Sequence, residues 1–200
     1  MSYAIIGFGA VGQALAHAFA RRDIEVAVAG RRPAEALASQ ARAIGRTVVP
    51  KALGDAIKAD TIILAVPFGS HQEVGKAQAR WDGKTIIDAM NAFGVPPAEL
   101  DGLPSSAAVA RAFPGGRLVK GFNHLAAGVL RGDPAIGDLR RVVFLSSDDA
   151  GGAATVAALA ERLGFAPVEL GRLAEGGALV QARGSTWAPL IFQDLFKRQV

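Results

Sequence analysis

A glycine-rich turn near the N-terminus constrains the fold more than any other part of the sequence. It follows a short apolar run at 3–6 and opens a segment, up to residue 22, whose apolar residues recur every three and four positions, as on one face of a helix. A second strand is predicted at 24–29. The turn consists of Gly7, Phe8, Gly9, Ala10, Val11 and Gly12. This order of strand, glycine turn, helix and strand is typical of the first half of a dinucleotide-binding unit.

Each glycine of the turn has a separate physical task in such a unit. Gly7 allows the tight turn after the strand, Gly9 lets the backbone approach a pyrophosphate, and Gly12 lets the helix pack closely on the sheet. The helix N-terminus offers free N–H groups and a partial positive charge to the phosphates. We therefore expect the six turn residues to bind the pyrophosphate of a dinucleotide. The alternative is a glycine turn that only packs.

The end of the second predicted strand favours NADP over NAD. An NAD site requires an acid there for the ribose 2′-hydroxyl, but this chain has Gly30, Arg31 and Arg32, and Glu25 lies at the wrong end of the strand. A guanidinium binds the extra phosphate of NADP through paired donors, whereas a carboxylate would repel it. We expect Arg31 to bind this phosphate and Arg32 to bind it or to stack on the adenine. The alternative is an ordinary solvated entry to a helix that starts at Pro33.

The composition limits the remaining possibilities. Half of the 200 residues are hydrophobic, which suits one domain with a sizeable core, and no apolar run approaches the roughly 20 residues of a membrane span. With no cysteine and three scattered histidines, we expect no disulfide and no metal site. The net charge of +4 is spread along the chain, so we expect no nucleic-acid partner. The N-terminus lacks the basic region of a signal peptide, and we expect a cytoplasmic enzyme.

The later segments continue the alternation of strands and helices. We expect strands at 46–50, 61–66, 84–88, 141–146 and 166–170, with another starting at 118, and helices at 33–44, 51–58, up to about 80, at 105–113, up to 130 and from 147–149 to 163. The chain, 1–200, is therefore predicted to be one Rossmann-like, doubly wound α/β domain with a mainly parallel sheet. Residues 172–200 are predicted to be a short helical C-terminal segment, packed on the sheet or at a homodimer interface.

Two later strand ends supply further candidate cofactor contacts, because ligands of a doubly wound sheet bind outside the carboxyl ends of its strands. These candidates are Ala65, Val66, Pro67 and His71 after the strand at 61–66, and Asn91 and Ala92 after the strand at 84–88. Asn91 is expected at the nicotinamide. The alternatives are a solvated loop histidine and an asparagine that bonds to its own backbone.

Six sequence elements together resemble the NADP-dependent oxidoreductase family whose best-known members use coenzyme F420, a deazaflavin. They are 7–12, 30–32, 64–67, 87–91, 118–123 and 165–171, in the family's order. The resemblance implies a hydride transfer between NADP(H) and a deazaflavin or similar acceptor. It also implies that the acceptor is flanked by Asn123, His124, Leu125 and Ala126. The chain differs from the family at Ala92, Gly121 and His124, and the last of these lies in the acceptor region.

The sequence offers no Ser-His-Asp set, carboxylate pair or poised lysine, so we name no catalytic residue. Hydride transfer requires only that the protein sets the distance and orientation of the two rings. His124 is either a donor to the acceptor or a helix-entry residue. The alternatives are a flavin or ferric reductase on the same fold, an imine or hydroxyacid reductase, and a non-catalytic NADP-binding sensor. Imine reductases normally need a large helical C-terminal domain, for which the residues after Leu170 are too few.

Overall fold

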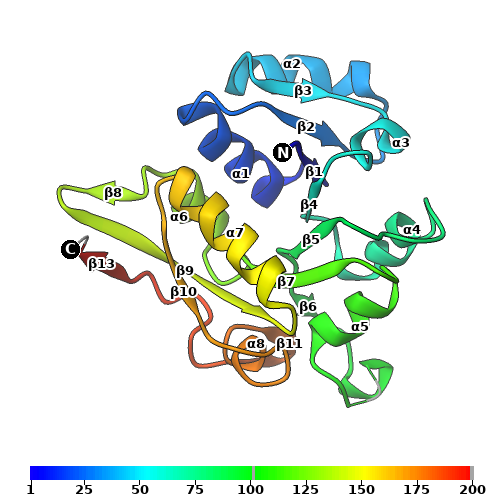
Figure 1. Cartoon of the computed structure of the whole chain (residues 1–200), viewed down its shortest axis with the longest axis vertical. Helices are drawn as coiled ribbons and strands as arrows, with labels where there is room; N and C mark the ends of the chain where they lie inside the picture. The colour runs from blue at the N-terminus through cyan, green and yellow to red at the C-terminus, as the bar shows by residue number, and fades with distance from the viewer. Residues whose placement is uncertain (101, 199–200) are drawn as a thin grey trace.

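The computed structural model describes residues 1–100 and 102–198, and it is organised around a ten-stranded sheet (Figure 1). Eight of its strands follow the order β10-β9-β7-β5-β4-β1-β2-β3, and β8 and β13 pair with β9. These strands are β1 (Tyr3–Ile6), β2 (Val26–Ala29), β3 (Val48–Pro50), β4 (Thr61–Leu64), β5 (Thr85–Asp88), β7 (Arg117–Gly121), β8 (Ala135–Ile136), β9 (Leu139–Ser147), β10 (Ala166–Glu169) and β13 (Phe196–Arg198). A smaller sheet of order β12-β11-β6 contains β6 (Ala92–Phe93), β11 (Ala182–Gly184) and β12 (Thr186–Trp187).

The helices lie between these strands along the chain. They are α1 (Ala10–Arg21), α2 (Ala34–Ile44), α3 (Leu53–Ala56), α4 (His71–Gly75), α5 (Ser105–Arg111), α6 (Ala127–Arg131), α7 (Ala150–Arg162) and α8 (Gly176–Leu179), with 3-10 turns η1 (Phe68–Ser70) and η2 (Pro97–Leu100). Because most strand pairs are parallel and helices connect them, the predicted Rossmann-like α/β fold is confirmed. Within the described residues, no helix is long and apolar enough to cross a bilayer.

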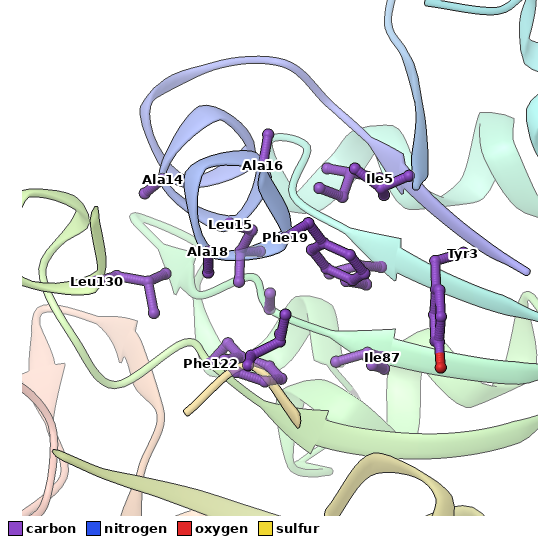
Figure 2. Packing of buried hydrophobic residues seen from close by; sticks show 14 of the residues in the cluster. Tyr3, Ile5, Ala14, Leu15, Ala16, Ala18, Phe19, Ile87, Phe122 and Leu130 are labelled. Atoms are coloured by element: carbon purple, nitrogen blue, oxygen red, sulfur yellow. The ribbon is translucent and has the colours of Figure 1, made fainter. Parts of the chain in front are cut away.

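The core has two layers, because alternate residues of each central strand face opposite sides of the sheet. Ile5, Ile87 and the other residues of one face pack under α1 and α7. Figure 2 shows part of this layer, with Phe19 of α1 close to Ile5 and Tyr3. The ring centroids of Tyr3 and Phe19 are 5.3 Å apart. The other face packs under α3, α4 and α5.

The strand order changes direction at β1, and this sets the position of the site. The strands on either side of β1 are β2 and β4, and both pair with it in parallel. The chain therefore leaves the carboxyl ends of β1 and β4 toward opposite faces of the sheet. Such a change of direction opens a crevice beyond the strand ends, where doubly wound proteins bind their ligands.

The predicted helix that extends to about residue 80 is shorter than expected. α4 ends at Gly75, where an added Cβ would lie 2.3 Å from the carbonyl oxygen of Ala112. The buried Trp81 then donates its indole N–H to the Gly75 carbonyl oxygen, at 3.2 Å. Close packing on α5 and this side-chain hydrogen bond replace the further turns that the periodicity predicts.

The prediction of a helical segment at 172–200 is wrong for most of its length. Among the described residues of this segment, 172–198, only α8 is helical, and the remaining elements are the strands β11, β12 and β13. Gly184, with φ +56°, and Pro189 divide the segment into pieces too short to form stable helices. These pieces instead pair with strands already present, β11 with β6 and β13 with β9. Residues 101, 199 and 200 belong to the predicted single domain but lie outside the described residues.

Candidate functional site: a dinucleotide cleft

The turn after β1 has a backbone that requires glycine at two positions. Gly7 has φ +104°, and a Cβ there would lie 2.2 Å from the carbonyl oxygen of Ala65, at the end of β4. A Cβ on Gly12 would lie 1.9 Å from the carbonyl oxygen of Gly7. These two residues therefore let β1, α1 and the end of β4 approach one another closely. They explain why the cleft can form at this place.

The N-terminus of α1 is open to a ligand. Gly9 is the N-cap residue and makes no side-chain hydrogen bond, and the first turn of α1 contains no acidic residue. A Cβ added at Gly9 would meet nothing within 4 Å. The first N–H groups of a helix have no partner within the helix, so they point into this open space with the positive end of the helix dipole. The arrangement suits a pyrophosphate.

A cleft of about 690 Å³ lies in front of this helix end. Nine predicted residues line it: Gly7, Phe8, Gly9, Gly30, Arg31, Arg32, Ala65, Val66 and Pro67. Ala10, Val11 and Gly12 belong to the first turn of α1 and do not line the cleft. The lining also includes Ser70 and Glu73, which the sequence analysis missed. Both residues follow the strand at 61–66 and Pro67 within a few positions. Because ligands bind outside the carboxyl ends of such strands, this position could have indicated them.

Arg31 and Arg32 differ in how free their side chains are. Arg32 donates to the Gln40 side-chain oxygen at 2.7 Å. Arg31 is exposed and makes no hydrogen bond or ion pair with any residue that the structure describes. A guanidinium without a partner at the rim of an anion-binding cleft fits the 2′-phosphate of NADP. The residues of the cleft therefore fit this cofactor.

His71 does not line the cleft, contrary to the sequence prediction. It is the first residue of α4, it is buried, and its Nδ1 contacts the carbonyl oxygen of Phe68. The ring packs on the Phe68 ring and faces a separate hollow together with Gln72 and Lys76. His71 begins a helix rather than lying in a loop, and its side chain points toward the interior.

Asn91 and Asn123 form a pair that joins the ends of β5 and β7. Asn91 donates to the carbonyl oxygen of Asn123 at 2.9 Å, and Asn123 donates to the side-chain oxygen of Asn91 at 3.0 Å. Both are also hydrogen-bonded to the segment where β11 begins. Asn123 donates to the Val180 carbonyl oxygen, and the Ala182 N–H donates to the side-chain oxygen of Asn91. Ala92 is buried in β6. None of these residues lines the cleft.

His124 lies in the interior of the protein. Its ring is fully buried 4.8 Å from the Phe144 ring, and neither ring nitrogen has a hydrogen-bond partner among the described residues. Burial lowers the pKa of His124 to about 4, and the Val142 backbone and the Asp194 carboxylate oppose this shift only partly. A neutral imidazole without an exposed atom is a poor proton donor. Leu125 is buried as well, and only Ala126 is exposed.

The buried His124 should make the protein less stable in acid. In the unfolded chain His124 takes up a proton as the pH falls below 6.5, whereas in the folded chain it stays neutral until about pH 4. The free energy of unfolding therefore decreases as the pH is lowered from 6.5 to 4. Between pH 7 and 5 we expect this residue to cost about 2 kcal/mol. Urea unfolding at both pH values should show this loss in the wild type, and His124→Phe should reduce it. His17→Gln is the comparison variant: burial and the nearby Arg131 also lower the pKa of His17, but this side chain is only partly buried, so its removal should reduce the loss less than His124→Phe does. Equal losses in the wild type and in His124→Phe would refute the assignment.

A buried ion pair was missed by the sequence analysis. Lys120 and Asp88 are paired residues on the neighbouring parallel strands β7 and β5, and both side chains are fully buried, with Nζ 3.1 Å from Oδ2. Lys120 also donates to the Met90 carbonyl oxygen at 2.6 Å, and Asp88 accepts from Met90 N–H at 3.0 Å and from Ser106 at 2.7 Å. The pair therefore holds the turn that leads to Asn91. A lysine that directly follows the apolar residues Leu118 and Val119 was the available signal.

The fold and the cleft define a dinucleotide-binding protein of the Rossmann class. Residues 2–92 match the family described as NADP oxidoreductase, coenzyme F420-dependent. A hypothetical protein from Sinorhizobium meliloti is 40% identical, with a TM-score of 0.91 over 98% of this chain and 96% of that chain. The chain belongs to this family, so it is an NADP-dependent oxidoreductase and NADP is its cofactor.

Two further comparisons extend this result. A candidate F420-dependent NADP reductase from Arthrobacter sp. FB24 is 28% identical, with a TM-score of 0.69 over 86% of each chain. An imine reductase from Aspergillus terreus is 22% identical, with a TM-score of 0.66 over 88% of this chain, and at this identity the likeness shows the fold alone. The present chain spans only 57% of that enzyme. A search of the curated proteins finds no match.

Proposed function

We propose that the protein transfers a hydride between NADPH, bound in the cleft, and a deazaflavin or flavin acceptor, with coenzyme F420 as the first candidate. The observation that carries the proposal is the free guanidinium of Arg31, located in the same cleft as the open N-terminus of α1. When bound, NADPH supplies the hydride from its nicotinamide ring, and the acceptor takes up this hydride and, where needed, a proton from water.

The protein's own residues would act by binding and orientation. The turn 7–12 would hold the pyrophosphate, Arg31 and Arg32 the 2′-phosphate, and Ala65 to Pro67 the inner edge of the dinucleotide. Glu73 offers a carboxylate that can accept from a ribose hydroxyl. Asn91 would act indirectly, by fixing Asn123 and the acceptor side of the site. No general acid or base is required in this scheme.

The acceptor can be identified by following NADPH oxidation with coenzyme F420, FMN and a ferric chelate in separate assays. Turnover with coenzyme F420 alone supports the proposal in its first form. Turnover with FMN or iron alone keeps the cofactor site but makes the protein a flavin or ferric reductase. Measurable NADPH binding without any turnover would refute the proposed reaction and favour the non-catalytic sensor.

Arg31→Ala should weaken NADPH binding by about 1.5–3 kcal/mol, roughly 10- to 150-fold, because a charged hydrogen bond to the 2′-phosphate is lost. NADH has no such phosphate, so its affinity should stay nearly unchanged. Calorimetric titration with each cofactor measures both effects. Arg42→Ala, an exposed arginine in the last turn of α2, is the matched control. An equal loss for both cofactors would mean that Arg31 has a structural role.

A homodimer and a cytoplasmic location are further parts of the proposal, as is the single-domain organisation. Self-association is supported by two exposed apolar residues, Ile136 in β8 and Leu195 immediately before β13. Both of these strands pair with β9. Sedimentation velocity of the purified protein measures the oligomeric state directly, and a monomer at micromolar concentration would remove the dimer from the proposal.

A further inference from the structure

Three aromatic side chains outside the cleft form an exposed group, here named the aromatic cluster: Phe93, Trp187 and Phe192. They are 52%, 61% and 39% exposed, although aromatic side chains are normally among the more buried. The ring centroids of Phe93 and Trp187 are 6.2 Å apart, those of Trp187 and Phe192 are 5.1 Å apart, and both pairs meet edge to face. An exposed group of aromatic rings of this kind indicates a binding surface.

The aromatic cluster is held in place by the smaller sheet. Phe93 ends β6, which pairs with β11 opposite Gly184, and β11 pairs with β12 through Ala182 and Trp187. Figure 1 shows β6 and β11 close together, below β5 and β7. Two of the three rings therefore stand on paired strands rather than on a free chain end. A preformed surface loses little conformational freedom when it binds a ligand.

The position of the cluster connects it to the acceptor side of the site. Phe93 follows Asn91 by two residues, and the backbone N–H of Phe192 donates to the carbonyl oxygen of His124 at 2.6 Å. Asn91 and Asn123 are joined by their own hydrogen bonds. The cluster thus lies beside the residues that follow β5 and β7, on the side where the family resemblance implies that the acceptor binds.

Backbone strain is concentrated at the same corner. Phe192 has φ +59° and Phe122, immediately before Asn123, has φ +62°. These are two of the three described residues other than glycine with a positive φ. Residues in this conformation are unfavourable, persist only where the surrounding structure holds them, and gather at ligand sites. The strain supports a functional role for this corner.

We propose that the aromatic cluster is the docking platform for a planar, fused-ring acceptor of the flavin or deazaflavin type, which stacks on Trp187. This inference rests on the proposed function. The alternative occupant is a second copy of the chain. At roughly 150–250 Å² per aromatic side chain, the exposed parts of the three rings amount to about 300 Å², whereas a stable interface buries about 800 Å² per partner. The size of the surface therefore favours one ring system.

The two tryptophans of the chain provide a direct test. Trp81 is fully buried and packs edge to face on Phe113 at 4.9 Å, while Trp187 is exposed. Titration of the NADP⁺-saturated protein with FMN and, separately, coenzyme F420 should quench the exposed tryptophan emission saturably. The quenching should disappear in Trp187→Phe, which also corrects for light absorbed by the ligands. The arm that quenches identifies the ring system.

A kinetic arm completes the test. Trp187→Ala should raise the acceptor KM at least tenfold and leave the Kd of NADPH unchanged, and Arg42→Ala, at the exposed arginine of α2, should change neither. If the wild type turns over the acceptor and Trp187→Ala has the same acceptor KM, the platform is overturned and the proposed function stays intact. Saturable quenching without turnover would overturn the proposed function and support the platform. The absence of quenching in both arms, or a dimer that Trp187→Ala converts to a monomer, would overturn the platform.

Discussion

Replacing Lys120 with methionine should lower the free energy of unfolding by about 3–5 kcal/mol. The substitution leaves the Asp88 carboxylate fully buried beside β7 without its counter-charge. It also removes the donor to the Met90 carbonyl oxygen. The cost of an unpaired charge in the interior exceeds the small gain from the apolar side chain, because the dielectric constant there is low. Urea unfolding at pH 7 measures the effect.

Two further variants separate charge from packing. Asp88→Asn combined with Lys120→Met removes both charges and should recover much of the lost stability, since the asparagine oxygen can still accept from Met90 N–H. Arg80→Met breaks the exposed pair with Asp82 and should cost little stability, because solvent screens exposed ion pairs. If Lys120→Met costs no more than Arg80→Met, the buried pair does not stabilise the fold in the way the geometry implies.

Replacing Gly12 with alanine should damage both the fold and cofactor binding. The added methyl would lie 1.9 Å from the Gly7 carbonyl oxygen and 3.3 Å from the Ile5 side chain, so α1 has to move away from β1. Overpacking of this kind costs about 1–3 kcal/mol, and contact with backbone atoms places Gly12→Ala at about 3 kcal/mol. NADPH affinity should fall roughly tenfold or more, because the turn and the helix end move together. Thermal unfolding and calorimetric titration measure the two effects.

Gly9→Ala should separate these two effects. Its methyl would meet no protein atom within 4 Å, so stability should stay within about 0.5 kcal/mol of the wild type. The same methyl would occupy the space in front of α1, so NADPH affinity should still fall roughly tenfold. Gly128→Ala in α6, also without near neighbours, is the control and should change neither property adversely. Unchanged NADPH binding by Gly9→Ala would place the pyrophosphate elsewhere.

The features that depend on neighbouring residues could be predicted from the sequence. The turn 7–12 and the arginines after β2 are each defined within a few residues, and the structure brings most of them to one cleft. His71 was misplaced because its orientation depends on where α4 begins, which the sequence does not mark. The expected residues 123–126 lie mostly in the interior because Asn123 bonds to Val180, 57 residues away.

The same distinction explains the C-terminal segment. Its apolar residues at helical spacing suggested helices, but its conformation depends on open edges of β6 and β9 that are defined far earlier in the chain. The Lys120–Asp88 pair likewise depends on the register of two strands, and no local pattern reports that register. Contacts between distant segments therefore account for most of what sequence reasoning missed.

The hydrogen bonds from Asn91 and Asn123 to residues 180–182 also impose an order on assembly during synthesis. The turn that would hold the pyrophosphate needs only β1, α1 and the end of β4, so it is complete once about the first seventy residues have left the ribosome. The hydrogen bonds that fix Asn91 and Asn123 have to wait for residues 180–182, more than a hundred residues later. The residues that would hold the cofactor are therefore synthesised well before the residues that fix Asn91 and Asn123 in place.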